Sequence, residues 1–165
     1  MLENKDKYGF TLIELLVVIS IIGLLATVVM VSLNSARLKA RSTKAIGDLK
    51  SLSLALEMYY DNNGSYPNSQ GGAGVWDGYY TCWGDSTPNW ILGLAPQYIS
   101  QLPREPRNIT NCGSQYIYNS NGTDYKLIYH GPEDCAGVVV KYSNLSDPVR
   151  VCWAYGIYTP GAVGW

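Results

Sequence analysis

Hydrophobic residues follow three successive patterns along this chain. Residues 10–33 are almost continuously apolar, and Glu14 is their only charged side chain. In residues 34–62, apolar residues recur at the three- and four-residue spacing of one helix face, at Ala45, Leu49, Leu52, Leu56 and Tyr59. From residue 63 on, the period shortens towards two and Gly, Asn, Ser and Pro become frequent, which is typical of strands joined by turns. The pattern predicts an α+β chain: a long N-terminal helix, transmembrane then amphipathic, packed on a small antiparallel β-sheet head.

The apolar segment 10–33 predicts a transmembrane helix. Its 24 residues would span about 36 Å at the helical rise, which is long enough to cross a bilayer. A buried core helix would need a larger protein around it, and a cleaved secretory signal would have a shorter apolar region ending at a small-residue cleavage site. We therefore expect the segment to remain in the mature protein as a membrane anchor.

The same helix is predicted to continue as an amphipathic segment over residues 34–62. The run from Asp61 to Gly64 supplies the stop, and Pro67 follows just beyond it. Residues 63–165 then form the predicted globular head.

Within the head, the clearest element is a hairpin formed by residues 115–119 and 125–130. Asn121-Gly122 supplies its turn. Alternation and β-branched residues predict further strands at residues 138–142 and 149–155.

Net charge and amino-acid composition limit the kinds of molecule that this chain is expected to bind. The formal net charge is −1, from 12 Lys and Arg against 13 Asp and Glu, and residues 63–165 carry −2. This balance excludes a polybasic nucleic-acid binder, so no nucleic-acid partner is expected. The head also holds 11 Tyr and all 5 Trp. These aromatics suit either an adhesive, sugar-stacking surface or core packing and subunit contacts, and we favour the second.

The four cysteines indicate the compartment of the head. Cys82, Cys112, Cys135 and Cys152 form an even set without the close spacing of a zinc or redox motif. Two disulfides are expected, and disulfides persist outside the reducing cytoplasm. The basic residues that follow the apolar segment argue weakly for the opposite orientation, but long domains translocate largely regardless of flanking charge.

Glu14 is the one residue of the apolar segment whose charge is unfavourable inside a membrane. A carboxylate there reaches the headgroups, takes up a proton, or has a functional partner. Its surroundings, Lys7-Tyr8-Gly9-Phe10-Thr11-Leu12-Ile13-Glu14, favour the second. This string resembles the prepilin signature of type IV pilins and of the pseudopilins of type II secretion systems. The stretch from Tyr98 to Pro106 and the following hairpin resemble the middle of the heads of that family.

The resemblance implies how the chain is processed. A prepilin peptidase of the inner membrane would cut between Gly9 and Phe10, remove the leader peptide 1–9, and methylate the new amine of Phe10. Glu14 would then neutralise Phe10 of a neighbouring subunit in the filament core, or the Phe10 amine of its own chain. Residues 10–33 would first lie in the lipid bilayer and later pack against neighbouring subunits in the filament.

Two details of the family pattern bear on assembly and pairing. Many pilins have a Pro midway along the apolar half, but this chain has none before Pro67, so no proline kink is expected. Four cysteines allow three pairings. The family pattern favours Cys135–Cys152 with Cys82–Cys112, and the other two pairings stay open.

No catalytic, cofactor or metal site is predicted. The single histidine, His130, ends a predicted strand with no nucleophile motif near it. Asp147 and the carbonyls around it supply too few oxygen ligands for calcium.

The sequence therefore predicts a structural subunit and not an enzyme. We interpret the chain mainly as a type IV pilin that is anchored in the inner (cytoplasmic) membrane by a single span. Its C-terminal domain would lie outside the cytoplasm. Copies would assemble into a helical homo-oligomeric filament on the cell surface with the help of pilus or secretion machinery. The alternatives are a type II secretion pseudopilin and a non-polymerising, membrane-anchored minor pilin or adhesin.

Overall fold

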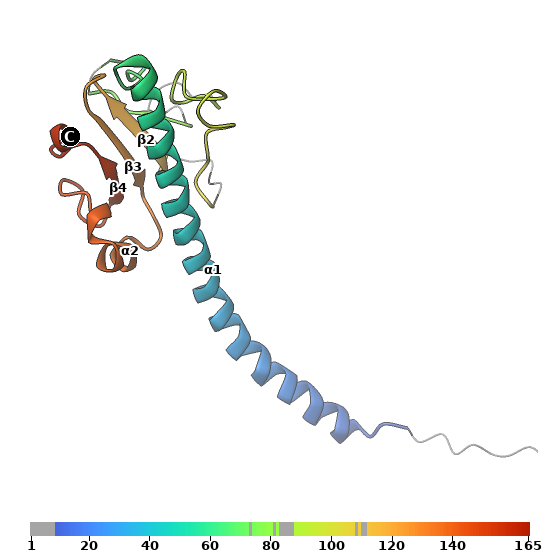
Figure 1. The fold of residues 1–165 in the computed structure, drawn as a ribbon. Helices are drawn as coiled ribbons and strands as arrows, with labels where there is room; N and C mark the ends of the chain where they lie inside the picture. Colours follow the sequence, from blue (N-terminus) through green and yellow to red (C-terminus); the bar gives the residue numbers. More distant parts are fainter. Residues whose placement is uncertain (1–8, 73, 81, 83–87, 108, 110–111) are drawn as a thin grey trace, which may run out of the picture. The chain divides into compact units, whose positions relative to one another are not determined.

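A computed structural model describes residues 9–72, 74–80, 82, 88–107, 109 and 112–165 of the chain. The chain divides into two compact units, Met1–Arg37 and Leu38–Trp165. The helix α1, Leu12–Asn63, contributes to both units, and all other elements belong to the second (Figure 1). We describe each unit by itself.

The first unit consists of the apolar part of α1. Every described residue from Gly9 to Arg37 is exposed. These include large apolar side chains such as Leu12, Ile13 and Val31, which are 81%, 70% and 74% exposed. Within this unit the apolar segment has no protein surface to pack against, so another apolar environment must cover it.

In the second unit, the remainder of α1 packs its predicted face on the head. Ala45, Leu49, Leu52 and Leu56 are fully buried, and Tyr59 packs against the same core. The helical spacing of these residues thus places them on one stripe, as predicted from the sequence.

The head is a four-stranded antiparallel sheet. Its strands lie in the order β1, β2, β3 and β4, of which Figure 1 labels the last three. Their bounds are Asp77–Gly78, Gln115–Ser120, Tyr125–His130 and Ala154–Tyr158. The predicted hairpin is confirmed: β2 and β3 pair from Gln115 with His130 to Ser120 with Tyr125. Gly122 has φ of 88° in the connecting turn, a conformation that glycine adopts without steric cost.

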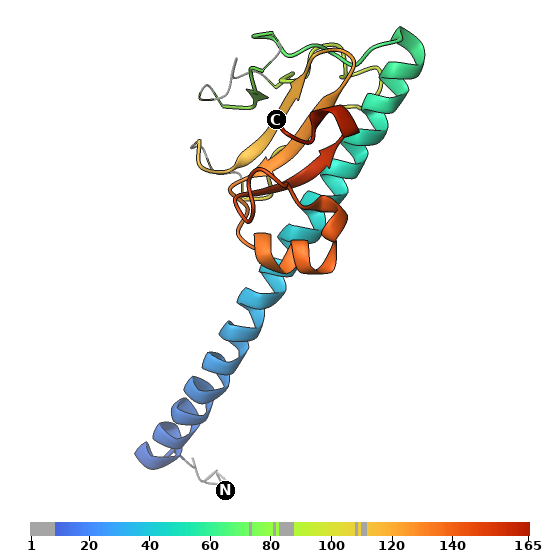
Figure 2. The same ribbon diagram turned by 90° about the vertical axis from the view of Figure 1, so that its left-hand side faces the viewer.

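The two faces of the sheet contact different neighbours. Tyr116, Tyr118 and Leu127 belong to the main core cluster together with α1, whereas Ile117 and Ile128 form a smaller cluster with Ala154 and Trp76 on the opposite face. This alternation is the period of two that strands impose. Figure 2 shows the head part of α1 beside the sheet.

Most of the head tyrosines are core residues. The buried ones are Tyr66, Tyr116, Tyr118, Tyr125, Tyr129 and Tyr155. Three hydroxyls reach carboxylates of α1: Tyr116 donates to Asp48 at 2.9 Å, and Tyr66 and Tyr125 donate to Glu57 at 3.0 and 3.3 Å. Their rings fill the core while their polar atoms pair at its edge, which explains this excess of tyrosine.

The C-terminal third differs from the prediction. Residues predicted as a strand at 138–142 belong to the helix α2, Cys135–Lys141, because the Asp134 carboxylate caps it by accepting from the Gly137 N–H at 2.9 Å. The strand predicted at 149–155 begins only at Ala154. The N–H groups of Val149 and Arg150 bond to the Asp147 carboxylate, so they turn the chain instead of joining the sheet. Short 3-10 helices, η2 (Ser143–Leu145) and η3 (Pro160–Ala162), complete this region.

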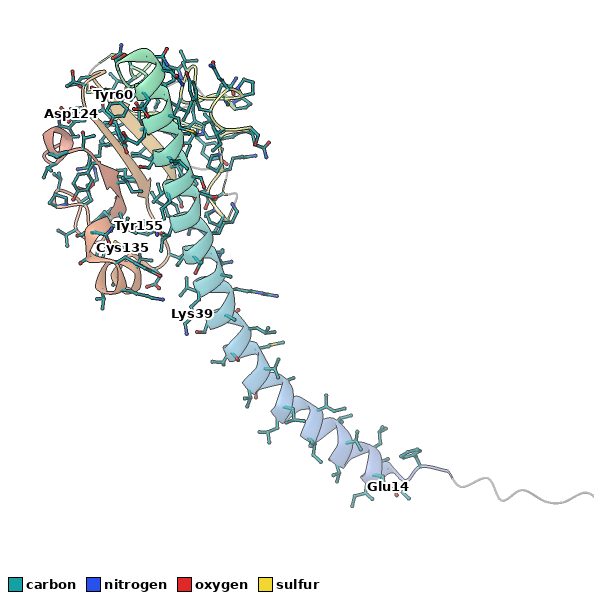
Figure 3. The ribbon with its side chains drawn as sticks, in the orientation of Figure 1. Glu14, Lys39, Tyr60, Asp124, Cys135 and Tyr155 are labelled. Carbon is teal, nitrogen blue, oxygen red and sulfur yellow. A yellow bond between two sulfur atoms is a disulfide. The ribbon has the colours of Figure 1, made fainter. Side chains whose placement is uncertain are left out.

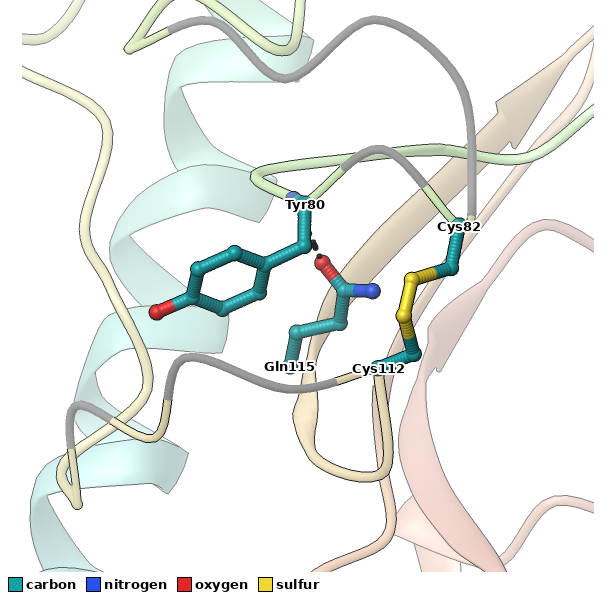
Figure 4. Close-up of a disulfide and its surroundings, with 4 residues drawn as sticks. All are labelled: Tyr80, Cys82, Cys112 and Gln115. Carbon is teal, nitrogen blue, oxygen red and sulfur yellow. Dashed lines mark hydrogen bonds between the residues drawn. A yellow bond between two sulfur atoms is a disulfide. The ribbon is translucent and has the colours of Figure 1, made fainter.

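The cysteines form one disulfide. Cys82 and Cys112 are bonded, with their Cα atoms 5.8 Å apart, beside a hydrogen bond of 3.0 Å from the Tyr80 N–H to Oε1 of Gln115 (Figure 4). This is one of the two expected bridges. The second is not formed in the structure, where Cys135 and Cys152 are free thiols.

Candidate functional site

The N-terminal junction of the helix carries the predicted processing residues. Gly9 and Phe10 precede α1, and Phe10 is 87% exposed. A Cβ added at Gly9 would meet no atom within 4 Å. The peptide bond between them is therefore open to an approaching enzyme in this unit.

Glu14 lies in the first turn of α1 (Figure 3), and Thr11 holds it there. Oε2 of Glu14 accepts hydrogen bonds from the backbone N–H of Thr11 at 2.8 Å and from its hydroxyl at 2.7 Å. In return, Oγ1 of Thr11 accepts from the N–H of Glu14 at 3.3 Å. This reciprocal arrangement is a capping box, in which two N–H groups of the helix start find acceptors.

Thr11 was missed as a site residue in the sequence. The signal was available, since Thr followed three residues later by Glu immediately before an apolar run is the pattern of a capping box. From the sequence, Glu14 was interpreted only through its charge, as a partner of the Phe10 amine. The structure shows that Thr11 and Glu14 also start the helix together.

The second carboxylate oxygen of Glu14 remains available. Among the residues that the structure describes, no hydrogen bond involves Oε1 of Glu14. An ionised carboxylate can accept about four hydrogen bonds. The capping box therefore fixes the position of the group without using its capacity to bind a cation.

The polar side chains of the apolar segment satisfy their own hydrogen bonds. Ser20 donates to the carbonyl of Leu16 at 2.8 Å, and Thr27 donates to the carbonyl of Leu24 at 2.8 Å. Such internal bonds let hydroxyls enter an apolar environment without an unpaired donor. By length and composition, α1 is the one helix of the described chain that is apolar enough to cross a membrane.

The head offers no metal-binding group among the residues described. No group of three or more His, Cys, Asp and Glu side chains is placed to hold a metal ion in that part of the chain. Asp147 is engaged by Lys126 and Arg150. His130 is half-buried at the end of β3, and its pKa is lowered by burial and by the nearby Arg150.

Comparisons with known proteins agree with the N-terminal geometry. The prokaryotic N-terminal methylation motif matches residues 4–30, which include Gly9, Phe10 and Glu14. The type II secretion system core protein G of Escherichia coli strain K12 is 45% identical over 136 residues, covering 81% of this chain and 87% of that protein. The chain belongs to the type II secretion system core protein G family.

Core protein G of two other organisms is also similar to this chain. Core protein G of Dickeya chrysanthemi is 42% identical over 136 residues, covering 80% of this chain and 81% of that protein. Core protein G of Pseudomonas aeruginosa is 35% identical over 123 residues, covering 74% and 80%. The comparison with solved structures found no match.

The family bears on the two filament assignments drawn from the sequence. The resemblance to type IV pilins and pseudopilins is confirmed. The relatives support the alternative, a type II secretion pseudopilin, better than the main interpretation of a type IV pilin of a cell-surface pilus. The apolar helix and the methylation motif also fit anchoring in a membrane.

Proposed function

We propose that this chain is a pseudopilin, a structural subunit that is cut between Gly9 and Phe10 and then polymerises into the pseudopilus of a type II secretion system. One observation carries the proposal. An apolar segment in which every described residue is exposed begins with a single carboxylate, Glu14, held in place by Thr11. A lone fixed charge at the start of an uncovered apolar helix calls for a cationic partner in the same apolar environment.

A prepilin peptidase supplies that cation. Cleavage after Gly9 creates an amine on Phe10, and the same enzyme would methylate it. The high exposure of Phe10 and the open surroundings of Gly9 support access to this bond.

Glu14 receives the amine during assembly. Its free Oε1 would bind the Phe10 amine of a neighbouring subunit, so that two charges neutralise each other as both enter the apolar core of the assembly. The exposed side chains Ile13, Val17 and Val18 line, with Phe10 and Glu14, a shallow hollow of about 350 Å³. A neighbouring helix would cover this apolar surface around the pair.

The head would lie outside the cytoplasm, with residues 10–33 crossing the inner membrane once. The disulfide between Cys82 and Cys112 supports this orientation, because such bonds persist in oxidising compartments. Residues 1–9 would remain on the cytoplasmic side until the peptidase removes them. The subunit would act by assembly and not as an enzyme.

The experiment is intact mass spectrometry with N-terminal sequencing of the protein from sheared filaments and, separately, from the membrane fraction of secreting cells. The proposal requires a chain that begins at methylated Phe10 in the membrane fraction, whereas the same species as a main component of sheared cell-surface filaments would favour the type IV pilin interpretation instead. A chain that begins at Met1 in both would overturn it.

A matched pair of variants tests the cleavage site. Gly9→Leu places a bulky side chain at the scissile bond and should leave a full-length precursor in the membrane. Gly9→Ala is the control for the smallest side chain and should be processed more fully than Gly9→Leu. Normal processing of Gly9→Leu would contradict the proposal.

A further inference from the structure

A hollow of about 420 Å³ lies between α1 and α2 in the second unit of the chain. It is separate from the N-terminal junction that carries Gly9, Phe10 and Glu14. One of its lining residues, Lys39, is labelled on α1 in Figure 3. The lining includes Lys39, Ser42, Thr43 and Ile46 of α1 and Val138 and Lys141 of α2.

Apolar and ionic contacts hold the two sides of the hollow together. Ile46 and Val138 are 8% and 4% exposed and belong to the same core cluster. Arg41 of α1 forms an ion pair with Glu133, which lies just before α2, with Nε and Oε2 2.7 Å apart. The hollow is therefore a preformed feature of the fold, as ligand sites usually are.

Two lysines of the hollow have no carboxylate partner. Among the described residues, the ammonium group of Lys39 takes part in no hydrogen bond or ion pair. That of Lys141 lies 5.2 Å from the centre of the Tyr142 ring and has no acidic partner in the same part of the chain. Lys44, by contrast, is paired with Asp48 at 3.1 Å. Lys39 and Lys141 are thus available to bind an anion.

Hydroxyl groups add uncharged donors to the hollow. The side chains of Ser42 and Thr43 make no hydrogen bond to any described residue. The Asp134 carboxylate also lines the hollow, and its Oδ1 accepts from the N–H of Gly137 at 2.9 Å. Two lysines against one carboxylate leave the lining with a net positive charge. Ammonium and hydroxyl groups are the donors that phosphate oxygens accept from.

The sequence places these donors close to the end of the apolar segment. Lys39 follows Leu33, the last apolar residue, by six positions in the same helix. Six residues rise about 9 Å along a helix, and the headgroup layer is about 5–8 Å thick on each side of a bilayer. Helical side chains tilt towards the N-terminus of their helix, so a lysine at this position can reach back towards the headgroups.

The charge around this point also suits an anionic membrane surface. Residues 34–47 contain four basic side chains and no acidic one. Basic clusters beside a membrane span attract anionic lipids. Lys141 adds a cation from α2, a segment distant in sequence, so the hollow offers more than the basic run of one helix.

We propose that the hollow between α1 and α2 binds the phosphate group of an anionic membrane phospholipid, with Lys39 and Lys141 as its cations and Ser42 and Thr43 as hydroxyl donors. The inference rests on the proposed anchoring of residues 10–33 in the inner membrane. Free phosphate offers the same chemistry. A phospholipid is favoured because the shared bilayer keeps its concentration high beside the helix that carries Lys39. The bound lipid would tie the head to the bilayer surface through α2 as well as through α1.

The test measures lipid binding to the purified full chain in a nonionic detergent by native mass spectrometry. Phosphatidylglycerol is the anionic probe, and phosphatidylcholine carries the same phosphate with a compensating cation. We expect clear binding of phosphatidylglycerol and much weaker binding of phosphatidylcholine. Inorganic phosphate is added as a competitor at millimolar concentration, and we expect it to leave the lipid bound.

Lys141→Gln is the decisive variant, because attraction to the basic run of α1 alone would not depend on it. We expect it to weaken phosphatidylglycerol binding about fivefold, and the double variant with Lys39→Gln about 25-fold, from the usual effect of one lysine at an anionic surface. Lys50→Gln is the matched control, since Lys50 is an exposed lysine of α1 that does not line the hollow. It should bind like the wild type. Circular dichroism shows whether each variant is folded.

Four results would overturn the proposal. Equal binding by Lys141→Gln and the wild type would remove α2 from the site, and an equal loss in Lys50→Gln would indicate unspecific attraction. Equal binding of the two lipids would remove the role of charge. Displacement of the lipid by inorganic phosphate would assign the hollow to free phosphate. The assay needs neither cleavage nor assembly, so its failure is distinguishable from failure of the proposed function, which the N-terminus of the chain in cells decides.

Discussion

Lys126 and Asp147 form an ion pair inside the head, with Nζ and Oδ1 2.9 Å apart and both side chains fully buried. Nζ also donates to the carbonyl oxygens of Val163 and Trp165, each at 3.0 Å. The other carboxylate oxygen of Asp147 accepts from Arg150 at 3.1 Å. Every donor of the ammonium group is thus used, which is the condition under which a buried ion pair is tolerated.

Replacement of Lys126 should strongly destabilise the head. Lys126→Met leaves the Asp147 carboxylate buried without its main partner, so we expect a loss of about 3–5 kcal/mol in the free energy of unfolding. Chemical denaturation of the full chain in detergent measures this loss. The double variant Lys126→Met with Asp147→Leu removes both charges and should recover part of it. A single variant as stable as the wild type would show that the pair contributes nothing.

Stability at high pH should depend on Tyr116. Burial, with the nearby Asp48 carboxylate, raises the pKa of Tyr116 above its ordinary value of 10.0. Above pH 10 the unfolded chain loses this proton while the folded chain keeps it, so the folded state loses stability as pH rises. The slope from this one group approaches about 1.4 kcal/mol per pH unit.

The variant Tyr116→Phe isolates that contribution. It should be less stable at neutral pH by about 1 kcal/mol, since it lacks the hydrogen bond to Asp48. Between about pH 10 and about 12, from the pKa of free tyrosine upward, its stability should fall less steeply than that of the wild type. Parallel curves for the two proteins would contradict the assignment.

Glu14 should be required for assembly and not for membrane insertion. Glu14→Val makes the segment more apolar, so it should still insert, but it lacks the acceptor for the Phe10 amine. Glu14→Gln is the matched control, because its amide oxygen can still accept from Thr11 while the charge is lost. Filament counts by electron microscopy should fall in both variants, and a normal count for Glu14→Val would show that the carboxylate is unnecessary.

Thr11 should contribute through the capping box. Thr11→Val keeps the shape of the side chain but removes the hydroxyl, at a cost of about 0.5–2 kcal/mol for the first helical turn. Thr11→Ser keeps the hydroxyl and is the control. We expect fewer filaments with Thr11→Val than with Thr11→Ser, counted by electron microscopy. Equal counts would limit the role of Thr11 to that of a surface residue.

Gly156 should tolerate no side chain. A Cβ there would overlap the carbonyl oxygen of Leu127 and lie 2.7 Å from Cα of Ile128, both in the neighbouring strand. Gly156→Ala should therefore destabilise the head by at least about 1–3 kcal/mol, as overpacking does. Gly47→Ala is the control, because a Cβ at this exposed helical position meets nothing within 4 Å. It should stabilise α1 by up to about 1 kcal/mol, and thermal unfolding distinguishes the two.

Periodic elements were predictable from the sequence. The stripe of Ala45, Leu49, Leu52 and Leu56 and the hairpin around Asn121-Gly122 were identified because local spacing alone determines which residues share a face. The prediction failed at residues 138–142, where β-branched residues suggest a strand. There a single cap, Asp134, and the long-range packing of α2 decide the outcome, and strand propensity depends strongly on such context.

Long-range polar contacts were beyond the reach of sequence patterns. Lys126 occupies a strand position like any surface lysine, and its partners lie 21 to 39 residues away along the chain. Thr11 is a different case, because its signal was local. The family resemblance directed the interpretation of Glu14 towards another subunit, and the contact three residues away was overlooked.

Tyrosine hydroxyls of the head fix the rotation of the head part of α1 about its own axis. Asp48 and Glu57 are nine residues apart, which places them on opposite edges of the buried stripe at about 100° per residue. Each is held by a sheet or loop tyrosine. Rotation of the helix about its own axis in either direction would stretch one of these hydrogen bonds. The two bonds therefore oppose rotation in both directions. The outward residues, such as Leu54 and Met58, are thereby presented at a constant angle. In a helical polymer, a small angular error in each subunit adds up along the fibre. A fixed helix rotation therefore keeps the angle between successive subunits constant.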